Sequence, residues 1–318
     1  MRRALATSAL FLVTACQPAD TIPQESATPP KKIGVKQTVE TLAGKIGERN
    51  PGRYAQLEQA RAYITNRMKA AGYQPELQTF TGKLVKKDVH NLIFEKPGSK
   101  EIVVIGAHYD SVSLTPGADD NASGVAVLLH LAEQLQKEQF QRTVRFVFFT
   151  NEEPPYFLSD DMGSEVYARR CKERKENVVA MLSLETMGFY SDEPGSQHFP
   201  EGLTGYPDTG NFLAFVGNPE SKELVKLCLE RFHGVAKESL ITGESVGRLS
   251  DQASFWKYGY PGVMITDTAF FRNPNYHRKS DTPDTLDYER LEKAALGLEE
   301  VVKALGAQPS SNPTPSEK

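Results

Sequence analysis

Short apolar runs alternate along the chain with amphipathic stretches, and this alternation constrains the fold more than any other feature of the sequence. The runs have the length of buried strands, and the stretches between them carry apolar residues at helical spacing. Such alternation predicts an α/β fold of three layers, with helices on both faces of a mainly parallel (mixed) central sheet. The predicted strands are Val89–Phe94, Ile102–Ala107, Thr143–Thr150, Val178–Leu184, Phe212–Val216 and Gly262–Thr266, and the predicted helices lie near 36–48, 53–71, 122–137, 163–175, 219–235 and 287–305.

The N-terminus is expected to be a targeting segment. Two arginines precede an apolar stretch that ends at Ala15, and its length of about a dozen residues is too short for a mature membrane-spanning helix. Residues 1–15 are therefore interpreted as a signal peptide. Val13-Thr14-Ala15-Cys16 resembles a bacterial lipobox, which implies a lipid on Cys16 as the only membrane contact. The predicted location is the bacterial cell envelope, at the outer membrane or in the periplasm if the cell has two membranes.

The ends of the remaining chain are too polar to bury a core. Residues 16–35 are interpreted as a disordered tether and residues 307–318 as a disordered tail, leaving one folded domain from 36 to 306. The net charge of -4 argues against a nucleic-acid partner. Cys171 and Cys228 could form a bridge in an exported protein, but two buried free thiols are the favoured prediction. The sequence predicts no oligomeric state.

Polar groups suited to metal chemistry follow several of the predicted strands. His108 and Asp110 come after one strand, and residues i and i+2 of an extended chain face the same way. Asp110 could then hold one nitrogen of His108 while the other nitrogen binds a metal. A lone His-x-Asp in a polar loop would be the ordinary alternative.

The string Gly117-Ala118-Asp119-Asp120-Asn121-Ala122-Ser123-Gly124 is more specific. A carboxylate has two oxygens and can bridge two ions, although Asp, Asn and Ser also cap helices. Glu152 and Glu153 follow another strand, where one glutamate could bind metal while the other acts as a base. Glu185 ends a further apolar run, and His277 lies in a polar loop before the last helix. Each of these would be weak evidence alone.

Taken together, these five segments resemble the exported zinc aminopeptidase family that includes bacterial leucyl aminopeptidases, glutamate carboxypeptidase and glutaminyl cyclase. The resemblance covers about residues 36–305. It implies a peptide substrate and two zinc ions, or other divalent metals in their place. By this resemblance one ion is held by His108 and Glu185 and the other by Glu153 and His277, with Asp119 bridging both after being aimed by a cis peptide before Asp120. Catalytic roles are implied for Glu152, as the general base, and for Asp110.

The chain departs from the family pattern at three places. Glu185 stands where many members carry aspartate, Gln252 stands where members often carry histidine, and the link 154–162 is longer than usual. The longer link is expected to reshape the rim of the pocket. Eight aromatic residues flank the motifs and could line an apolar pocket or pack in the core: Tyr156, Phe157, Phe189, Tyr190, Phe255, Trp256, Phe270 and Phe271.

The predicted activity is removal of the N-terminal residue of peptides, with an apolar preference. A carboxypeptidase would need a cation for the substrate carboxylate, for which Arg248 and Arg272 are the candidates. A glutaminyl cyclase would use one zinc, and a lipoprotein that only binds peptides would need a decayed site. The presence of His108 and Glu185 beside the other ligands favours the hydrolase.

Overall fold

The computed structural model describes residues 1, 34–83, 86–242 and 247–307. The predicted signal peptide beyond Met1, nearly all of the tether and Cys16, the predicted site of lipidation, lie outside the described residues, as does the tail from residue 308. In the described chain no helix has the length and apolar character needed to cross a membrane.

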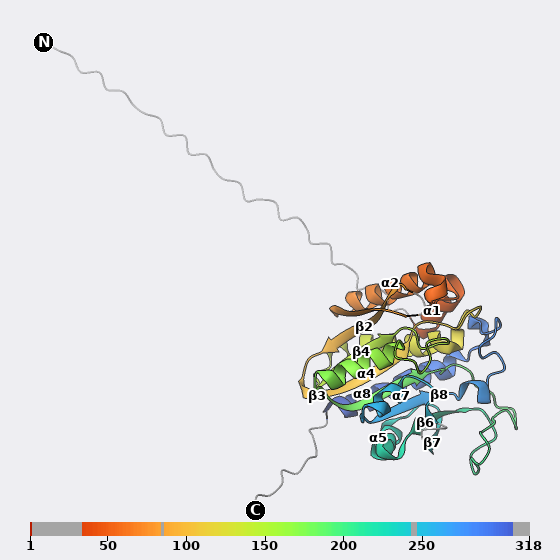
Figure 1. The fold of residues 1–318 in the computed structure, drawn as a ribbon. Coiled ribbons are helices and arrows are strands. Elements are labelled where there is room, and N and C mark those ends of the chain that lie inside the picture. Colours follow the sequence, from red (N-terminus) through yellow and green to blue (C-terminus); the bar gives the residue numbers. More distant parts are fainter. Residues whose placement is uncertain (2–33, 84–85, 243–246, 308–318) are drawn as a thin grey trace, which may run out of the picture. The chain divides into compact units, whose positions relative to one another are not determined.

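One eight-stranded mixed sheet forms the centre of the fold, in the order β1-β2-β4-β3-β5-β8-β6-β7 (Figure 1). The central strands β4, β3, β5 and β8 run parallel to one another, whereas β1, β2 and β4 pair antiparallel and β6 is antiparallel to β8. The strands are β1 (Pro75–Thr81), β2 (Asp88–Lys96), β3 (Ser99–His108), β4 (Arg142–Phe149), β5 (Asn177–Glu185), β6 (Phe212–Gly217), β7 (Ala236–Ile241) and β8 (Gly262–Thr266).

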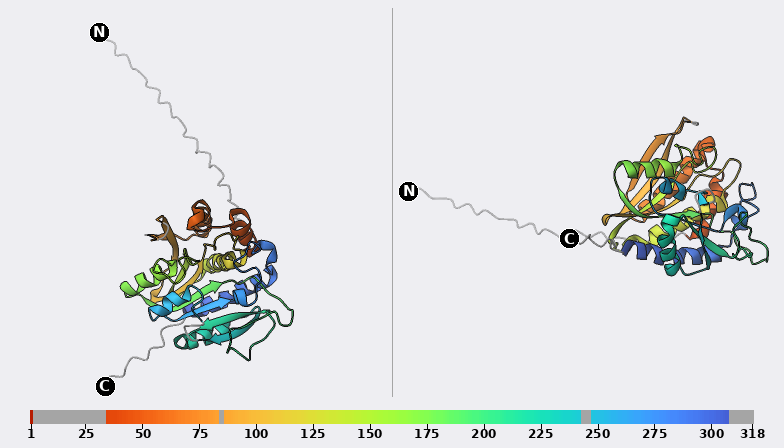
Figure 2. Two further views of the ribbon diagram at one scale, coloured as in Figure 1. Left: turned by 45° about the vertical axis from the view of Figure 1, so that its right-hand side comes forward. Right: turned by 60° about the horizontal axis from the view of Figure 1, so that its bottom comes forward.

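Helices cover both faces of the sheet, which confirms the predicted three-layer α/β fold (Figure 2). The larger apolar core contains side chains of α1, α2, α3, α5 and α8, while α4 and α7 pack on the opposite face. Beyond α7, that second face is covered by Phe199, Leu203 and Tyr206 of a long loop. The helices are α1 (Val35–Val39), α2 (Tyr54–Ala70), α3 (Gly124–Gln134), α4 (Gly163–Glu173), α5 (Lys222–Arg231), α7 (Gln252–Lys257) and α8 (Tyr288–Ala307).

The sequence pattern missed β1, β7 and the short helix α7. Both missed strands lie at the edges of the sheet, and their side chains are largely exposed or only partly buried. Edge strands need no continuous apolar run, because one side of each faces water. Helix α7 has only six residues, too few to show a helical period. The predicted helix 36–48 is α1 followed by a π-helical segment, Glu40–Ile46.

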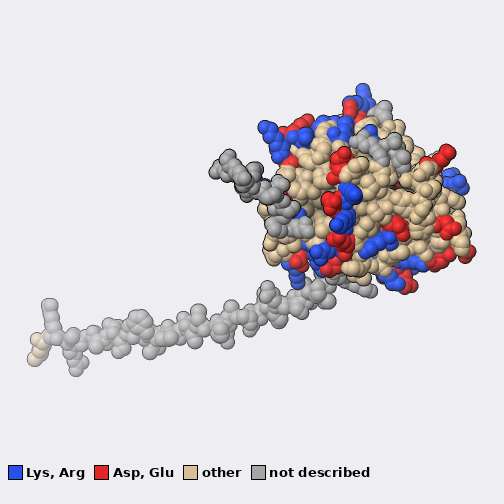
Figure 3. All heavy atoms as spheres, turned by 90° about the horizontal axis from the view of Figure 1, so that it is seen from below, with Lys and Arg blue, Asp and Glu red and all other residues tan. Residues whose placement is uncertain are grey.

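Cys171 and Cys228 are free and buried in separate apolar clusters, as the favoured prediction had it. Acidic and basic side chains are interspersed on the face shown in Figure 3, which agrees with the small net charge.

Candidate active site

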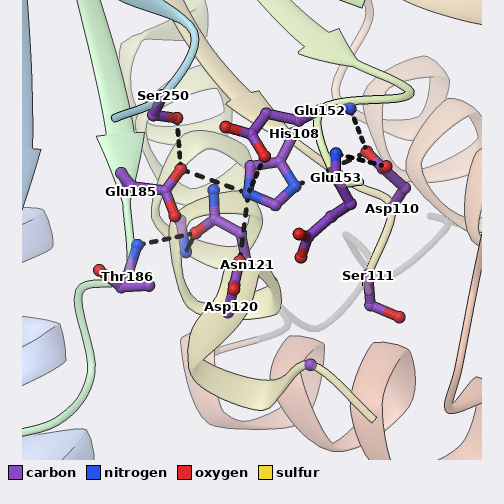
Figure 4. A network of polar contacts seen from close by, with 12 residues as sticks. His108, Asp110, Ser111, Asp120, Asn121, Glu152, Glu153, Glu185, Thr186 and Ser250 are labelled. Atoms are coloured by element: carbon purple, nitrogen blue, oxygen red, sulfur yellow. Dashed lines mark hydrogen bonds and ion pairs between the residues drawn. The ribbon is translucent and has the colours of Figure 1, made fainter. Parts of the chain in front are cut away.

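The register of the parallel strands brings the predicted site residues together. His108 ends β3 opposite Phe149 of β4, so Glu152 and Glu153 follow on one side of it. On its other side β5 ends at Glu185, two residues beyond Ser183, which pairs with Gly106. The carboxyl ends of parallel strands open at one edge of the sheet, where α/β proteins bind ligands. His108 therefore lies between a glutamate pair and a third glutamate (Figure 4).

Four non-glycine residues near this edge of the sheet have a left-handed backbone conformation, with positive φ. Asn151 (φ 58°) follows β4, Thr186 (φ 39°) follows β5, Thr268 (φ 86°) follows β8, and His277 (φ 57°) lies in the next loop. Positive φ at a non-glycine residue is uncommon and clusters at functional sites. The backbone thus turns sharply at three strand ends, next to the residues that form the site.

Two groups of potential metal ligands share Asp120. The Nε2 atom of His108 lies 3.2 Å from Asp120 Oδ1 and 3.3 Å from Glu185 Oε2. The Nε2 atom of His277 lies 3.0 Å from Asp120 Oδ2 and 3.2 Å from Glu153 Oε2. Within each group the ligand atoms lie within 4.8 Å of one another. The two oxygens of one carboxylate therefore face two different imidazoles.

This arrangement corrects the expectation that Asp119 would bridge. The Asp119 carboxylate points away from both imidazole groups and accepts hydrogen bonds from the Gly188 amide (2.9 Å) and Asn273 Nδ2 (2.7 Å). The cis peptide bond also lies one residue later than expected, between Asp120 and Asn121. Asp281 fixes the pair by accepting from the amides of Asp119 (2.8 Å) and Asp120 (3.2 Å). Neighbouring aspartates are identical in type, so only these backbone contacts distinguish them.

Asp110 lies where the i, i+2 argument placed it. Its Oδ1 is 3.6 Å from His108 Nδ1, and its carboxylate accepts hydrogen bonds from the amides of Glu152 (3.2 Å) and Glu153 (3.3 Å). It thereby connects the end of β3 to the glutamates that follow β4 (Figure 4). Ser250 has the same orienting role for Glu185, donating to its Oε2 at 2.6 Å. No sequence signal had marked Ser250, which reaches the site from the loop before α7.

Burial raises the pKa values of Glu152 and Glu153. The pKa of Glu152 lies well above its ordinary value, chiefly because the side chain is buried and because the Glu185, Glu153 and Asp251 carboxylates are near. Burial and the neighbouring Asp120 raise the pKa of Glu153 to about 8. Buried like charges at this density are unfavourable unless a cation compensates them.

The opposite shifts occur at Asp120 and the imidazoles. Burial alone would raise the pKa of Asp120, but contact with His108 and His277 holds it below its ordinary value. Burial opposes the charged form of His277, yet Asp120 and Glu153 raise its pKa to about 10. Without a metal ion, the imidazoles of His108 and His277 thus supply the positive charge that compensates the buried carboxylates.

The residues fit divalent metal ions better than they fit ion pairs. Both ring nitrogens of His108 and the Nε2 atom of His277 are inaccessible to solvent and make no hydrogen bond within the described chain. Their carboxylate neighbours are close but not in hydrogen-bonding geometry, as expected for ligands arranged around an ion. Imidazole and carboxylate are the ligands that zinc takes in catalytic sites. Asp110 and Ser250 would then orient the metal ligands His108 and Glu185, as outer-sphere partners do.

Glu152 stands beside these groups without belonging to either. Its Oε2 lies 3.9 Å from His108 Nε2, and the residue lines the same cavity as Asp120, Glu153 and Glu185. A carboxylate with a raised pKa that is not committed to a metal can accept and release a proton near neutral pH.

Arg49 holds the loop that joins His108 to Asp120, and sequence reasoning missed it. The side chain is fully buried and donates to the carbonyl oxygens of Tyr109 (2.8 Å), Pro116 (2.5 Å) and Gly117 (2.8 Å). Tyr109 follows His108, and Gly117 comes three residues before Asp120. The guanidinium therefore fixes both ends of the loop that carries two ligands. Burial lowers its pKa to about 10, against the opposing charges of Asp110 and other carboxylates.

Replacing Arg49 with methionine is expected to weaken divalent-metal affinity by about 10- to 100-fold, the usual loss for an outer-sphere partner. The three carbonyl oxygens lose their donor, so the two ends of the loop can separate. The measurement is competition for a divalent metal ion between the protein and a chelator. Arg53→Met is the matched control, because the Arg53 side chain is exposed and bonds Glu48 (3.2 Å) away from this loop. A folded Arg49→Met protein with unchanged metal affinity would contradict the positioning role.

An apolar cavity adjoins the acidic one. It shares Glu185, Leu249, Phe270 and Tyr276 with the acidic cavity. Of the eight flanking aromatic residues, Phe157, Phe270 and Phe271 line these two cavities, whereas Phe255 and Trp256 pack in the interior. The remaining lining of the apolar cavity comes from the sheet and the covering loop: Phe199, Pro200, Leu203, Val216, Leu240, Thr242, Met264, Thr266, Thr268 and Ala269.

The fold and this set of ligands define a metallopeptidase of the α/β type. The chain belongs to peptidase family M28, whose family model matches residues 91–302. The Escherichia coli K12 protein YfbL, named as uncharacterized, is 35% identical over 281 residues, covering 83% of this chain and 85% of YfbL. A "probable leucine aminopeptidase" of Trichophyton verrucosum is 31% identical over 226 residues, covering 65% of this chain. The chain spans 56% of that fungal protein's length.

Solved structures share the fold. The LapA aminopeptidase of Legionella pneumophila superposes with a TM-score of 0.70 at 18% identity, covering 87% of this chain and 72% of LapA. The zinc aminopeptidase BSAP of Bacillus subtilis superposes with a TM-score of 0.67 at 16% identity, covering 88% of this chain and 96% of BSAP. A glutaminyl cyclase of Fimbriiglobus ruber superposes with a TM-score of 0.62 at 19% identity, covering 91% of this chain and 99% of the cyclase. The family resemblance stated from the sequence is confirmed.

Proposed function

We propose that this metallopeptidase is an aminopeptidase that uses two zinc ions. The observation that carries the proposal is the pair of ligand groups sharing Asp120, with Glu152 uncommitted beside them. His108, Asp120 and Glu185 would hold one ion, and Asp120, Glu153 and His277 the other. Bound zinc supplies a Lewis acid for the scissile carbonyl and lowers the pKa of water to about 7.

The protein groups supply proton transfer and orientation. Glu152 accepts a proton from the attacking water and delivers it to the amine that leaves. Its raised pKa keeps the protonated form accessible for that second step. Asp110 orients the Glu152 and Glu153 backbone, and Ser250 orients Glu185. Burial of all these groups excludes bulk water from the proton transfer.

The charge of the acidic cavity supports recognition of a peptide N-terminus. Its described lining contains four carboxylates, from Asp120, Glu152, Glu153 and Glu185, and no lysine or arginine. A substrate ammonium group suits such a lining, whereas a substrate carboxylate would need a cation. Arg272, one candidate for that cation, is buried and donates to Gln197 Oε1 (2.8 Å) and the Phe212 carbonyl (2.9 Å). These contacts argue against Arg272, but not Arg248, as the cation of a carboxypeptidase.

The adjoining apolar cavity supports an apolar N-terminal residue. A pocket lined by Phe, Leu, Met and Val side chains stabilises an apolar side chain by removing its surface from water. Glutaminyl cyclase shares the fold, but two complete ligand groups favour a hydrolase with two ions over a one-zinc cyclase. A protein that only binds peptides would have no need of Glu152 in its present place.

Export as a lipoprotein anchored through Cys16 remains part of the proposal. It is supported by the lipobox-like Val13-Thr14-Ala15-Cys16 and the apolar segment before it. Metabolic labelling with a radioactive fatty acid tests it, with Cys16→Ala as the control.

Purified protein is expected to release p-nitroaniline from leucine p-nitroanilide, to lose this activity on chelation and to regain it with zinc. The reason is that the ligand groups need ions before Glu152 has a polarised substrate to act on. N-acetyl-leucine p-nitroanilide should be inert and glutamate p-nitroanilide slow, because the first lacks the ammonium and the second does not suit the apolar cavity. Metal content by atomic emission gives the stoichiometry. Cleavage from the carboxyl end, or cyclisation of N-terminal glutamine, would instead establish one of the alternatives.

A further inference from the structure

Arg248 differs from the other arginines that the structure describes. Its side chain is partly buried, its Nε atom is inaccessible to solvent, and it makes no hydrogen bond or ion pair within the described chain. The other arginines without such a bond, Arg174, Arg231 and Arg278, lie exposed to water. A guanidinium is always charged and is costly to remove from water without a partner. Arg248 therefore has the properties of a residue that binds an anionic ligand.

Arg248 lines a small cavity next to the active site. Its other described lining residues are Leu158, Ser159, Glu165, Ala253, Ser254 and Lys257. Their chain neighbours Phe157 and Leu249 line the acidic cavity that contains Glu152. The same two segments thus separate the small cavity from the catalytic groups.

The positive charge of the small cavity is not cancelled by its own residues. Glu165 is buried and already bonded to Lys257 Nζ (2.8 Å) and Tyr258 Oη (2.5 Å). Among the described lining residues, no carboxylate therefore remains to compensate the positive charge of Arg248. A guanidinium binds a planar carboxylate through paired hydrogen bonds, so a carboxylate is the ligand that suits it.

The positions of the two neighbouring cavities give the direction of a bound peptide. The apolar cavity shares Glu185, Leu249, Phe270 and Tyr276 with the acidic cavity, but not Glu152 or Phe157. An N-terminal side chain would occupy it. Since Glu152 delivers a proton to the leaving amine, the rest of the peptide would extend past Glu152 and Phe157, toward Arg248. We propose that Arg248 binds the C-terminal carboxylate of short peptides and so selects substrates with a free carboxyl end. The proposal rests on the aminopeptidase function.

The test compares peptides that differ only at the carboxyl end. Zinc-loaded full-length protein is given Leu-Ala and Leu-Ala-Ala, each as free acid and as C-terminal amide, together with Leu-Glu-amide and leucine p-nitroanilide. In wild type, kcat/KM is expected to favour the better free acid over its amide by about 10- to 100-fold, the usual effect of a hydrogen-bonded ion pair. In Arg248→Gln this ratio should fall to about 1, and Arg248→Lys should lie between. Arg231→Gln, an exposed arginine on α5, is the matched control and should retain the wild-type ratio.

The ratio is insensitive to a general loss of activity, because folding or zinc defects affect acid and amide alike. An equal ratio in wild type and Arg248→Gln would overturn the proposal. A preference for Leu-Glu-amide over Leu-Ala-amide that needs Arg248, without any preference for free acids, would overturn it in favour of an acidic side-chain site. Failure to release leucine from any of these substrates would overturn the aminopeptidase function, and this proposal with it.

Discussion

Replacing Glu152 with glutamine should reduce kcat by about 10²- to 10⁴-fold while leaving the metal content unchanged. The amide is close in shape to the carboxylate but cannot accept a proton from water or pass one to the leaving amine. Glu152 belongs to neither ligand group, so the loss should fall on turnover and not on zinc binding. Leucine p-nitroanilide turnover and metal analysis on the same samples measure the two effects separately.

Glu185→Gln is the matched comparison, since it makes the same chemical change at a residue that contacts His108 Nε2 at 3.3 Å. It should lose zinc as well as activity. KM or inhibitor affinity in Glu152→Gln should stay near the wild-type value, because substrate can still bind. Unchanged turnover in this variant would reject Glu152 as the base, and loss of zinc would make it a ligand instead.

Asp120→Asn should weaken zinc binding at both positions and lower kcat/KM by more than about 10²-fold. Outer-sphere changes already cost about 10- to 100-fold, and Asp120 is the residue whose two oxygens face both imidazoles. A neutral amide offers one oxygen and cannot compensate a second ion. Equilibrium dialysis against zinc should therefore show a loss of both ions, and not of one.

Asp119→Asn is the control for the neighbouring residue. The Asp119 carboxylate accepts from Gly188 and Asn273 and faces neither imidazole. An asparagine there can keep one acceptor, so zinc affinity should fall by about tenfold or less. If Asp119→Asn lost both ions while Asp120→Asn kept them, the bridging role would return to Asp119, as the family resemblance alone had implied.

The central layers of the fold were accessible from sequence because burial leaves a compositional signal. β3, β4, β5, β6 and β8 are buried along most of their length, so they read as apolar runs of strand length. β1 and β7 have mixed side chains, because an edge strand is stabilised by backbone pairing on one side. That pairing depends on the neighbouring strand and leaves little signal in local composition.

The site residues likewise divide into those that the sequence marks and those that it does not. Residues that end an apolar strand, such as His108, Glu153 and Glu185, can be found because the strand marks their place. Arg49 and Ser250 contact the site across 60 or more residues of chain, and neither ends an apolar strand. Contacts at this separation are decided by packing of whole elements, so residue type alone gives no indication of them.

The sequence by itself determined the α/β class and the family, and it marked His108, Glu153, Glu185 and His277 as candidate ligands, because strand periodicity and motif order are local properties of the chain. Tertiary structure alone decided that Asp120 rather than Asp119 faces both imidazoles. The cause is physical: the direction of each aspartate depends on the backbone held by Asp281 and Arg49, which pack against this segment from distant parts of the chain.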